Sequence, residues 1–340
     1  MTLIKNPLTI VQTGGGVAKP QTWAEFKATG TSELSAIYPV GSVIDNLPCS
    51  VKRMNNLSIS DDYYWVVENY GTTRLEGDNT DYPCAELVAL RTTPFNLAFD
   101  GPEQVLCDST TETTAEDGVY YYGTSVASGN IAANNTTALG LSTGDAIPYE
   151  DYARIFKSSI DTTNSNFANM WLYGYNNYAL SNIRQALNAD VASGWFTTSH
   201  IGDVLSTSYN SMAGFLHCLP DDFKAVLSAT KVDTALNTVT DGGTTVSTYD
   251  KIFLPSLYEL RLVTTPVEGN QFAGITMPER RCKSAVNSQV TGQTSSWWTR
   301  SAYRGSANLA YYVNTIGTSN YNIASNGIPV APACRIILPS

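Results

Sequence analysis

The sequence predicts an α+β protein, with strands toward both ends of the chain and short helices between them. Strand signals dominate residues 37–122, helix starts recur between residues 148 and 260, and residues 297–340 are again rich in strand formers. The two kinds of element are segregated along the chain, which favours an α+β arrangement over the βαβ order of a parallel sheet. The 340 residues are enough for two domains or for one large decorated domain.

The predicted strands combine aromatic with β-branched residues between turn-forming residues. Four segments in the first half of the chain share this signature: residues 63–67, 84–90, 95–99 and 119–123. The stretch 109–144 is rich in Thr, Ser, Ala, Asn and Gly. This composition predicts a loop-rich insertion at about residues 105–147.

The predicted helices are marked by capping side chains or by acidic residues in the first turn, which complement the helix dipole. Five starts carry such marks: a capping box at Thr22 and Glu25, an opening at Pro148, an N-cap at Ser181, a first-turn proline at Pro220 ahead of two aspartates, and a second capping box at Ser256 and Glu259.

The composition excludes several function classes. A net charge of −10 argues against nucleic acid, whose binding depends on Lys and Arg contacts to phosphate. No apolar run approaches the roughly 20 residues of a membrane span. The six cysteines show no CxxC or CxxH spacing, so we expect no zinc and free, mostly buried thiols. We expect no cofactor, no metal and no membrane insertion.

Catalytic equipment is also sparse. His200 and His217 are the only imidazoles, and no G-x-S-x-G serine is present to partner either of them. His217 adjoins Cys218, but neighbouring side chains usually point apart, so the pair makes a poor nucleophile and base. Asp61-Asp62 and Asp221-Asp222 lack the alternating ligand spacing of a calcium loop. We therefore expect a protein that is not an enzyme.

The C-terminal insert at residues 301–328 has an unusual composition. It consists mostly of Tyr, Asn, Ser, Thr, Ala and Gly, and Arg304 is its only charged residue. Antibody paratopes use the same mixture of rigid tyrosines and small polar residues. It also lacks Lys, Glu, Gln, Met and Trp, the residues that an asparagine codon cannot become when only its adenines are changed. The alternative is an ordinary hairpin rich in Gly and Asn.

The segments that frame this insert carry a family resemblance. Residues 297–301 (Trp-Trp-Thr-Arg-Ser) and 330–336 (Val-Ala-Pro-Ala-Cys-Arg-Ile) resemble the C-terminus of phage-borne variable proteins, many of which are targets of diversity-generating retroelements. That family has a C-type-lectin-like fold related to formylglycine-generating enzymes. Shorter segments resemble it in the same order along the chain: residues 37–42, 99–103, 181–188, 214–226 and 250–256. The resemblance covers about residues 37–340.

The resemblance implies a receptor-binding protein at the tip of a phage tail fibre, assembled in the host cytoplasm and carried on the virion. Residues 37–340 would form the C-type-lectin-like domain. Residues 1–36 precede the resemblance, and we expect them to attach the domain to other tail or baseplate proteins; the alternative is an ordinary ordered N-terminal extension. By the same analogy the tip would be a homotrimer that binds a host-cell surface receptor. Two alternatives remain open at this stage: a prophage- or bacterium-encoded adhesin or effector on the same fold, and an oxidase of the formylglycine-generating type.

The expected ligand-binding surface consists of polar and tyrosine side chains of the variable insert. Its members are Tyr303, Arg304, Ser306, Asn308, Tyr312, Asn314, Asn320, Tyr321, Asn322 and Asn326. Tyr303, Tyr312 and Tyr321 are the expected energetic anchors. We expect irregular backbone between Gly317 and Gly327, because strand alternation would separate Tyr321 from its asparagine neighbours.

The framing residues are expected to be scaffold. At least one of Trp297 and Trp298 should be buried, because paired indoles supply a large apolar area to a core. Arg300 and Arg335 should hold the flanking strands by bonding backbone carbonyls or a carboxylate.

Overall fold

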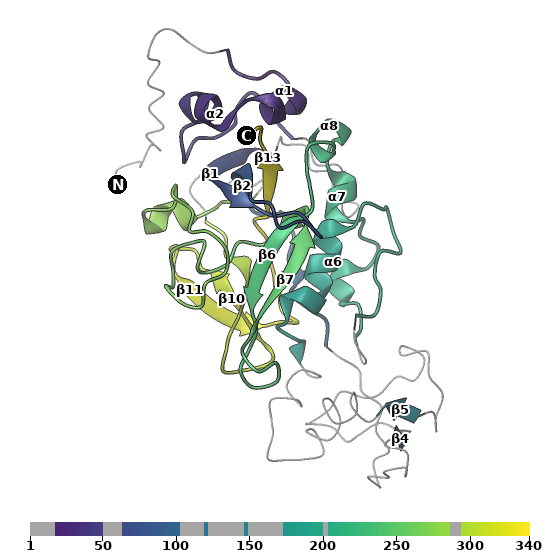
Figure 1. Cartoon of the computed structure of the whole chain (residues 1–340). Helices are drawn as coiled ribbons and strands as arrows, with labels where there is room; N and C mark the ends of the chain where they lie inside the picture. The colour runs from purple at the N-terminus through teal and green to yellow at the C-terminus, as the bar shows by residue number, and fades with distance from the viewer. Residues whose placement is uncertain are drawn as a thin grey trace.

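The structure is a computed structural model that describes residues 18–49, 63–102, 173–199, 203–285 and 294–340, with the backbone of residues 119–121 and 146–148. Helices and strands are both present and the strands predominate, which confirms the α+β class (Figure 1). Among the residues described, no helix has the length and apolar character needed to cross a membrane.

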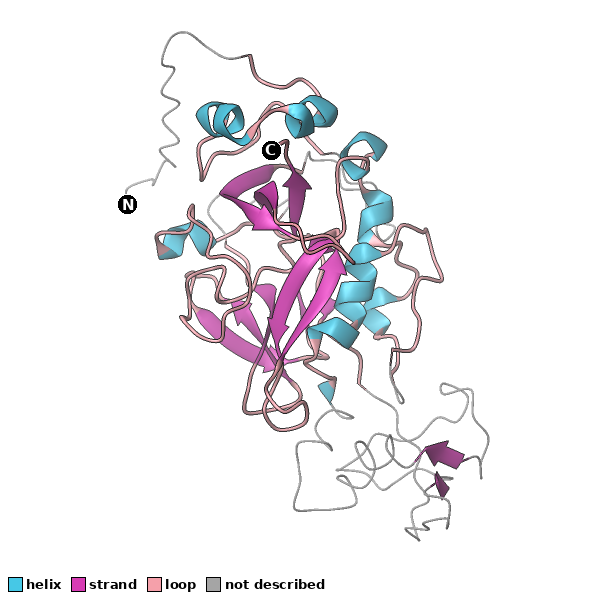
Figure 2. Cartoon of the chain, in the orientation of Figure 1, coloured by secondary structure: helices cyan, strands magenta, loops and turns pink. Residues whose placement is uncertain are grey.

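The helices are short, and three of the elements are 3₁₀ turns. They are α1 (Trp23–Ala28), α2 (Thr31–Ile37), η1 (Tyr178–Leu180), α6 (Asn182–Asn188), η2 (Thr207–Tyr209), α7 (Phe215–Cys218), α8 (Asp221–Lys224) and η3 (Pro278–Arg281). Helices α6, α7 and α8 follow one flank of the molecule, beside the strands (Figure 2).

Within the described residues, five small sheets are built from thirteen strands. They are β1 (Trp65–Thr73), β2 (Tyr82–Ala89), β3 (Leu97–Ala98), β4 (Val119–Tyr121), β5 (Ala146–Pro148), β6 (Thr230–Ala235), β7 (Thr245–Asp250), β8 (Ile252–Phe253), β9 (Trp297–Ala302), β10 (Leu309–Val313), β11 (Ser319–Ile323), β12 (Gly327–Ile328) and β13 (Ala333–Ile337). The four strand segments expected in the first half of the chain correspond to β1, β2, β3 and β4.

The central sheet joins the two ends of the chain. Its order is β1-β2-β13-β8, and every pairing is antiparallel. The last strand of the chain, β13, lies between β2 and β8, with Ala333 opposite Val88 and Ile337 opposite Cys84. Most residues of β2 and β13 are buried on both faces, as expected for strands in the middle of a covered sheet.

Residues 18–36 are part of this domain, which corrects the predicted boundary at residue 36. Trp23, Phe26 and Leu34 are fully buried in the main core. The Trp23 ring meets Phe223 of α8 at 4.5 Å between centroids, and Phe223 also stacks on Trp65 of β1. The physical reason is that α1 and α2 bury an apolar face of their own. The remainder of the predicted attachment segment, residues 1–17, lies outside the described residues.

Helices begin at three of the five predicted starts, those at Thr22, Ser181 and Pro220. The Glu25 amide donates to Thr22 Oγ1 at 3.1 Å, while the Glu25 carboxylate accepts from the Gln21 amide, one residue earlier than a standard capping box requires. Ser181 caps α6 through the Arg184 amide at 3.3 Å. Pro220 is the N-cap of α8 instead of its first helical residue. Pro148 ends β5, and the helix expected after it lies outside the described residues.

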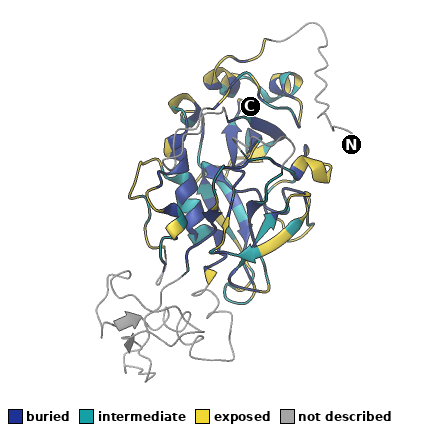
Figure 3. Cartoon of the chain, turned by 180° about the vertical axis from the view of Figure 1, so that it is seen from behind, coloured by how far each residue is buried: buried dark blue, intermediate teal, exposed yellow. Residues whose placement is uncertain are grey.

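A second, three-stranded sheet, which we call the C-terminal sheet, contains most of the C-terminal insert at residues 301–328. Its order is β11-β10-β9, and β9 begins with the paired indoles. Trp297 and Trp298 are both fully buried, which confirms their scaffold role. Each indole N–H donates to a carbonyl far away in sequence, Trp297 to Arg281 at 3.0 Å and Trp298 to Leu97 at 2.8 Å. Burial decreases from β9 to the exposed outer strand β11 (Figure 3).

The expectation of irregular backbone from Gly317 to Gly327 is wrong, because residues 319–323 form β11 and pair with β10 over their whole length. The Asn314 side chain closes the intervening turn by accepting from the amides of Ile316 and Thr318. Gly317 completes this turn at φ +78°, where a Cβ would lie 2.1 Å from the Pro278 carbonyl oxygen. Strands β10 and β11 of the insert therefore form a regular hairpin.

Candidate ligand-binding surface

The C-terminal sheet is anchored by a buried arginine that uses all five of its N–H donors. The Arg300 guanidinium forms two bonds with the Glu259 carboxylate, at 2.6 and 3.0 Å. Its three other bonds go to the backbone carbonyls of Asp233, Leu254 and Glu268. Because an arginine offers five donors in a fixed plane, this saturated geometry fixes the position of β9.

A second buried arginine extends the network to the central sheet. Arg335 of β13 donates to Glu86 of β2 at 2.7 Å and to Glu259 at 3.1 Å. The other Glu86 oxygen accepts from the Asn69 side chain at 2.7 Å. We call Glu86, Glu259, Arg300 and Arg335 the ion network. Its two carboxylates balance its two guanidinium groups, which is the condition for tolerating charge in a core.

The carboxylates also stabilise the charged form of the two arginines. Burial disfavours the charged form of each guanidinium, but Glu259 for Arg300, and Glu86 with Glu259 for Arg335, outweigh it and raise the pKa of both arginines. The Arg335 guanidinium also lies over the Phe253 ring at 4.5 Å. These contacts confirm that Arg300 and Arg335 are structural.

Glu259 occupies the centre of the ion network because of its local turn. The Ser256 amide donates to Glu259 at 2.9 Å and the Glu259 amide donates to Ser256 Oγ at 3.0 Å. This is the predicted capping box, although it closes a turn and not a helix. Gly269, at φ +95°, passes so close that a Cβ would lie 2.4 Å from the Glu259 carboxylate. Only glycine fits there.

The pairing register divides the side chains of the C-terminal sheet between two faces. Tyr311 lies opposite Tyr321, and Tyr312 lies opposite Asn320. Directly opposed residues of an antiparallel pair point to the same face, and successive residues point to opposite faces. Tyr311 and Tyr321 therefore share one face, and Tyr312 shares the other with Asn320 and Asn322.

Three tyrosines form a cluster on the first face. The ring centroids of Tyr303 and Tyr321 lie 4.6 Å apart, those of Tyr303 and Tyr311 5.6 Å apart, and those of Tyr311 and Tyr321 6.3 Å apart. Tyr321 is 48% exposed, and the other two are half-buried. We call Tyr303, Tyr311 and Tyr321 the tyrosine cluster. It offers a rigid aromatic surface with phenol groups available for hydrogen bonds.

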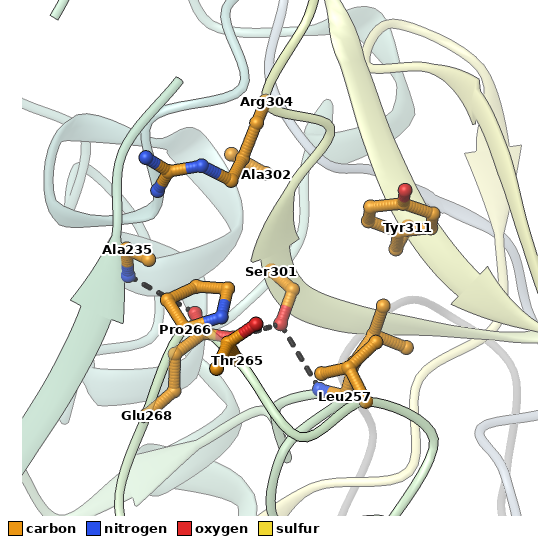
Figure 4. A pocket seen from close by; sticks show the side chains of 10 residues that line it. Ala235, Leu257, Thr265, Pro266, Glu268, Ser301, Ala302, Arg304 and Tyr311 are labelled. Atoms are coloured by element: carbon orange, nitrogen blue, oxygen red, sulfur yellow. Dashed lines mark hydrogen bonds between the residues drawn. The ribbon is translucent and has the colours of Figure 1, made fainter. Parts of the chain in front are cut away.

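A pocket of about 120 Å³ adjoins the tyrosine cluster at Tyr311 (Figure 4). The buried Glu268 carboxyl accepts from the Ala235 amide at 3.0 Å and from Ser301 Oγ at 2.6 Å. Burial raises the pKa of Glu268, and the nearby Arg300 only partly opposes this. The pocket is smaller than the roughly 300 Å³ of an ordinary ligand pocket. This pocket is therefore too small to hold an ordinary ligand.

The ten residues expected to bind ligand differ widely in exposure. Asn320, Tyr321 and Asn326 are exposed, Tyr303, Arg304, Tyr312, Asn314 and Asn322 are half-buried, and Ser306 and Asn308 are buried.

Ser306 and Asn308 are corrections to the predicted surface. They are 8% and 5% exposed, and the Ser306 hydroxyl donates to the Asn308 side chain. The Asn176 side-chain amide holds this loop by donating to the carbonyls of Ser306 and Leu309, at 2.6 and 2.8 Å. Both residues therefore shape the loop and do not face a ligand.

Arg304 and Asn314 are also engaged within the chain. The Arg304 guanidinium donates to the carbonyls of Leu236 and Gly243, at 3.2 and 3.0 Å. Asn314 holds the β10–β11 turn described above. Part of the hydrogen-bonding capacity of each residue is thus used for structure.

Within the described ranges, the residues considered for catalysis are not assembled into a site. His217 lies on α7, 3.7 Å from Asp190, and His200 lies outside the described residues. Cys334 is fully buried, and burial raises the pKa of its thiol well above the usual range. The five cysteines of the described ranges are all free thiols, as expected, and Cys107 lies outside those ranges. Within the same ranges, no group of three or more His, Cys, Asp or Glu side chains could hold a metal ion.

Two important residues escaped the sequence-based prediction. Tyr311 belongs to the tyrosine cluster, but only the pairing register distinguishes it from Tyr312. Glu259 was predicted as a helix cap, and nothing near it in sequence indicates that it binds two arginines. The available signal was not local: it was the combination of a capping glutamate, Glu259, with the two framing arginines, Arg300 and Arg335, that follow it in the chain.

The fold and the site together define an α+β domain that ends in a rigidly anchored sheet bearing tyrosines. The chain belongs to the family described as "Domain of unknown function (DUF6273)", whose model matches residues 152–338, more than half of the chain. No curated protein matches the chain. No solved structure matches it either.

Loss of Arg335 should destabilise the whole domain. Arg335→Met leaves Glu86 and part of Glu259 buried without a counter-charge, so we expect the free energy of unfolding to fall by about 3–5 kcal/mol. Chemical denaturation measures the change. Arg74→Met is the matched control, because the Arg74–Asp81 pair lies at the surface, and it should leave stability essentially unchanged. If both substitutions lowered the free energy of unfolding equally, the prediction that the buried ion pair matters more than the exposed one would be wrong.

The matched region should not fold alone. Residues 152–338 include Glu259, Arg300 and Arg335 but not β1 or β2, so a chain that starts at residue 152 lacks Glu86 and the sheet neighbour of β13. We expect this shortened chain to show no cooperative unfolding transition, whereas the full chain shows one. A dispersed amide NMR spectrum from the shortened chain would refute the prediction.

Proposed function

We propose that this protein is a phage receptor-binding protein, at the tip of a tail fibre, that recognises a host-cell surface ligand through its C-terminal sheet. The observation that supports this most directly is the tyrosine cluster, which combines exposed aromatic area with an anchored backbone. The role is recognition and not catalysis. It accords with the resemblance of the framing segments, 297–301 and 330–336, to phage-borne variable proteins.

The physical basis of the proposal is the low entropic cost of tyrosine contacts. A tyrosine has two side-chain torsions, so ordering it costs little compared with the area it buries. In the tyrosine cluster each ring already contacts the other two, so part of that ordering occurs on folding. Such preorganised aromatic residues are typical energetic hot spots of interfaces.

The finer features of the proposal rest on the resemblance. They are the C-type-lectin-like fold, a homotrimeric tip and a place on the virion, with attachment to tail or baseplate proteins assigned to residues 1–17. A trimer would present three copies of the tyrosine cluster. Several modest contacts on one particle would then give strong adsorption through avidity.

Variants of the tyrosine cluster test the proposal. Tyr303→Ser and Tyr321→Ser remove rings at the surface, so we expect a melting temperature close to that of the wild type. Cell binding should fall by roughly 30-fold or more for each anchor, the effect of a hot-spot residue worth about 2 kcal/mol. Binding of labelled full-length protein to a panel of bacterial strains is the measurement.

Tyr249→Ser is the matched control, since Tyr249 is a half-buried tyrosine on β7, outside the C-terminal sheet. It should leave cell binding unchanged. Unchanged cell binding in both cluster variants would contradict the proposal, and collapse of the fold would mean that the cluster belongs to the core.

A further inference from the structure

The opposite face of the C-terminal sheet contains an open groove of about 420 Å³. It lies between the Tyr312 face of the sheet, the segment before β9, and the β3–β12 pair. We call it the polar groove. Its lining residues are Asn96, Thr294, Ser295, Ser296, Tyr312, Thr315, Asn322, Gly327, Ile328 and Pro329. The volume lies within the roughly 300–1,000 Å³ range of small-molecule sites.

Among the residues that the structure describes, the lining contains no charged side chain. A charged ligand would therefore lose hydration in the groove without gaining a counter-ion, and that exchange is unfavourable. Six of the ten lining residues instead carry a neutral polar side chain, either a hydroxyl or an amide: two Asn, two Thr and two Ser. Hydroxyl groups both donate and accept hydrogen bonds, and amides carry donors and an acceptor side by side. A ligand with many neutral hydroxyl groups matches this lining.

The aromatic ring in the groove, that of Tyr312, packs against the core. The Tyr312 ring meets the buried Trp298 edge-on, with 6.1 Å between centroids and 89° between planes. Tyr312 is thus a half-buried ring whose orientation is set by the core. Such a ring supplies an apolar surface and a polar tip, which suits a ligand that has C–H faces as well as hydroxyl groups.

Several polar groups in the groove are available. Among the described residues, no partner uses the Asn96 side-chain amide or the Tyr312 hydroxyl. The Asn322 side-chain oxygen accepts from the Ile323 amide and from Asn326, at 2.9 Å each, so its NH₂ group is oriented and remains a donor. The groove therefore holds preorganised donors and acceptors around one fixed ring.

We propose that the polar groove binds a neutral saccharide, with the sugar ring against Tyr312 and its hydroxyl groups bonded to Asn96 and Asn322. Neutral sugar rings combine C–H faces with hydroxyl groups and carry no charge, and all three properties have counterparts in the lining. The inference depends on the chemistry of the polar groove alone. It holds whether or not the tyrosine cluster binds a host receptor.

The experiment titrates the full-length protein with the methyl β-glycosides of glucose, galactose and N-acetylglucosamine, observed by saturation-transfer NMR. Methyl β-glucuronide, which carries a carboxylate, is the charged comparison. We expect saturable binding of at least one neutral glycoside, with a dissociation constant on the order of 1 mM or tighter, and weaker binding of the glucuronide.

Two groove variants locate the site. Asn96→Ala removes an exposed amide, and Tyr312→Phe keeps the ring but removes its hydroxyl, so both should fold normally. Each should weaken saccharide binding by about 3- to 10-fold, the effect of one hydrogen bond exchanged with water. Tyr321→Ser, on the opposite face, is the control and should leave saccharide binding unchanged.

Three results would overturn the proposal. They are no saturable binding of any neutral glycoside, binding of the glucuronide as tight as that of the neutral sugars, and saccharide binding that both groove variants leave intact. If Tyr321→Ser alone abolishes saccharide binding, the sugar belongs to the tyrosine cluster and the groove assignment is wrong. Loss of cell binding in the tyrosine variants bears only on the receptor proposal, so the two proposals can fail separately.

Discussion

The four-charge ion network is the interaction on which the rest of the structure depends. Glu259 accepts four hydrogen bonds, from the Ser256 amide, from two Arg300 nitrogens and from Arg335. Through Arg300 it holds β9 of the C-terminal sheet, and through Arg335 and Glu86 it holds β13 and β2 of the central sheet. Burial makes this arrangement demanding, because each charge would be costly without its partners. The ion network thereby connects β2 and β13, which lie more than 200 residues apart in sequence.

This anchoring explains how the C-terminal sheet can support the two binding faces proposed above. Strand β9 is completely buried, β10 is partly buried, and β11 is mostly accessible. Side chains of β10 and β11 can therefore change with little effect on the core, whereas β9 cannot change. Strand alternation then directs the tyrosine cluster to one face and the polar groove to the other. A rigid scaffold with replaceable side chains is the usual arrangement for recognition surfaces.

Local features of the fold could be predicted from the sequence, while features that depend on distant partners could not. The caps at Thr22 and Ser181 depend on neighbours within three residues, and the buried indoles follow from their size and composition. Burial of Ser306 depends on Asn176, which lies 130 residues away in sequence. The face occupied by Tyr311 depends on the strand register. In the same way, the N-terminal helices belong to the core because Trp23 reaches Phe223, a contact that no local pattern encodes.

Native-state hydrogen exchange of the full-length protein, followed with increasing denaturant, tests most directly whether the ion network fixes the framing strands. The amides of β9 and β13 should exchange only through global unfolding, and those of β11 should exchange faster through local opening. This difference is expected if the network anchors the scaffold and leaves the outer strand free to vary. Exchange of β9 amides by local opening, at rates similar to those of β11, would contradict the account.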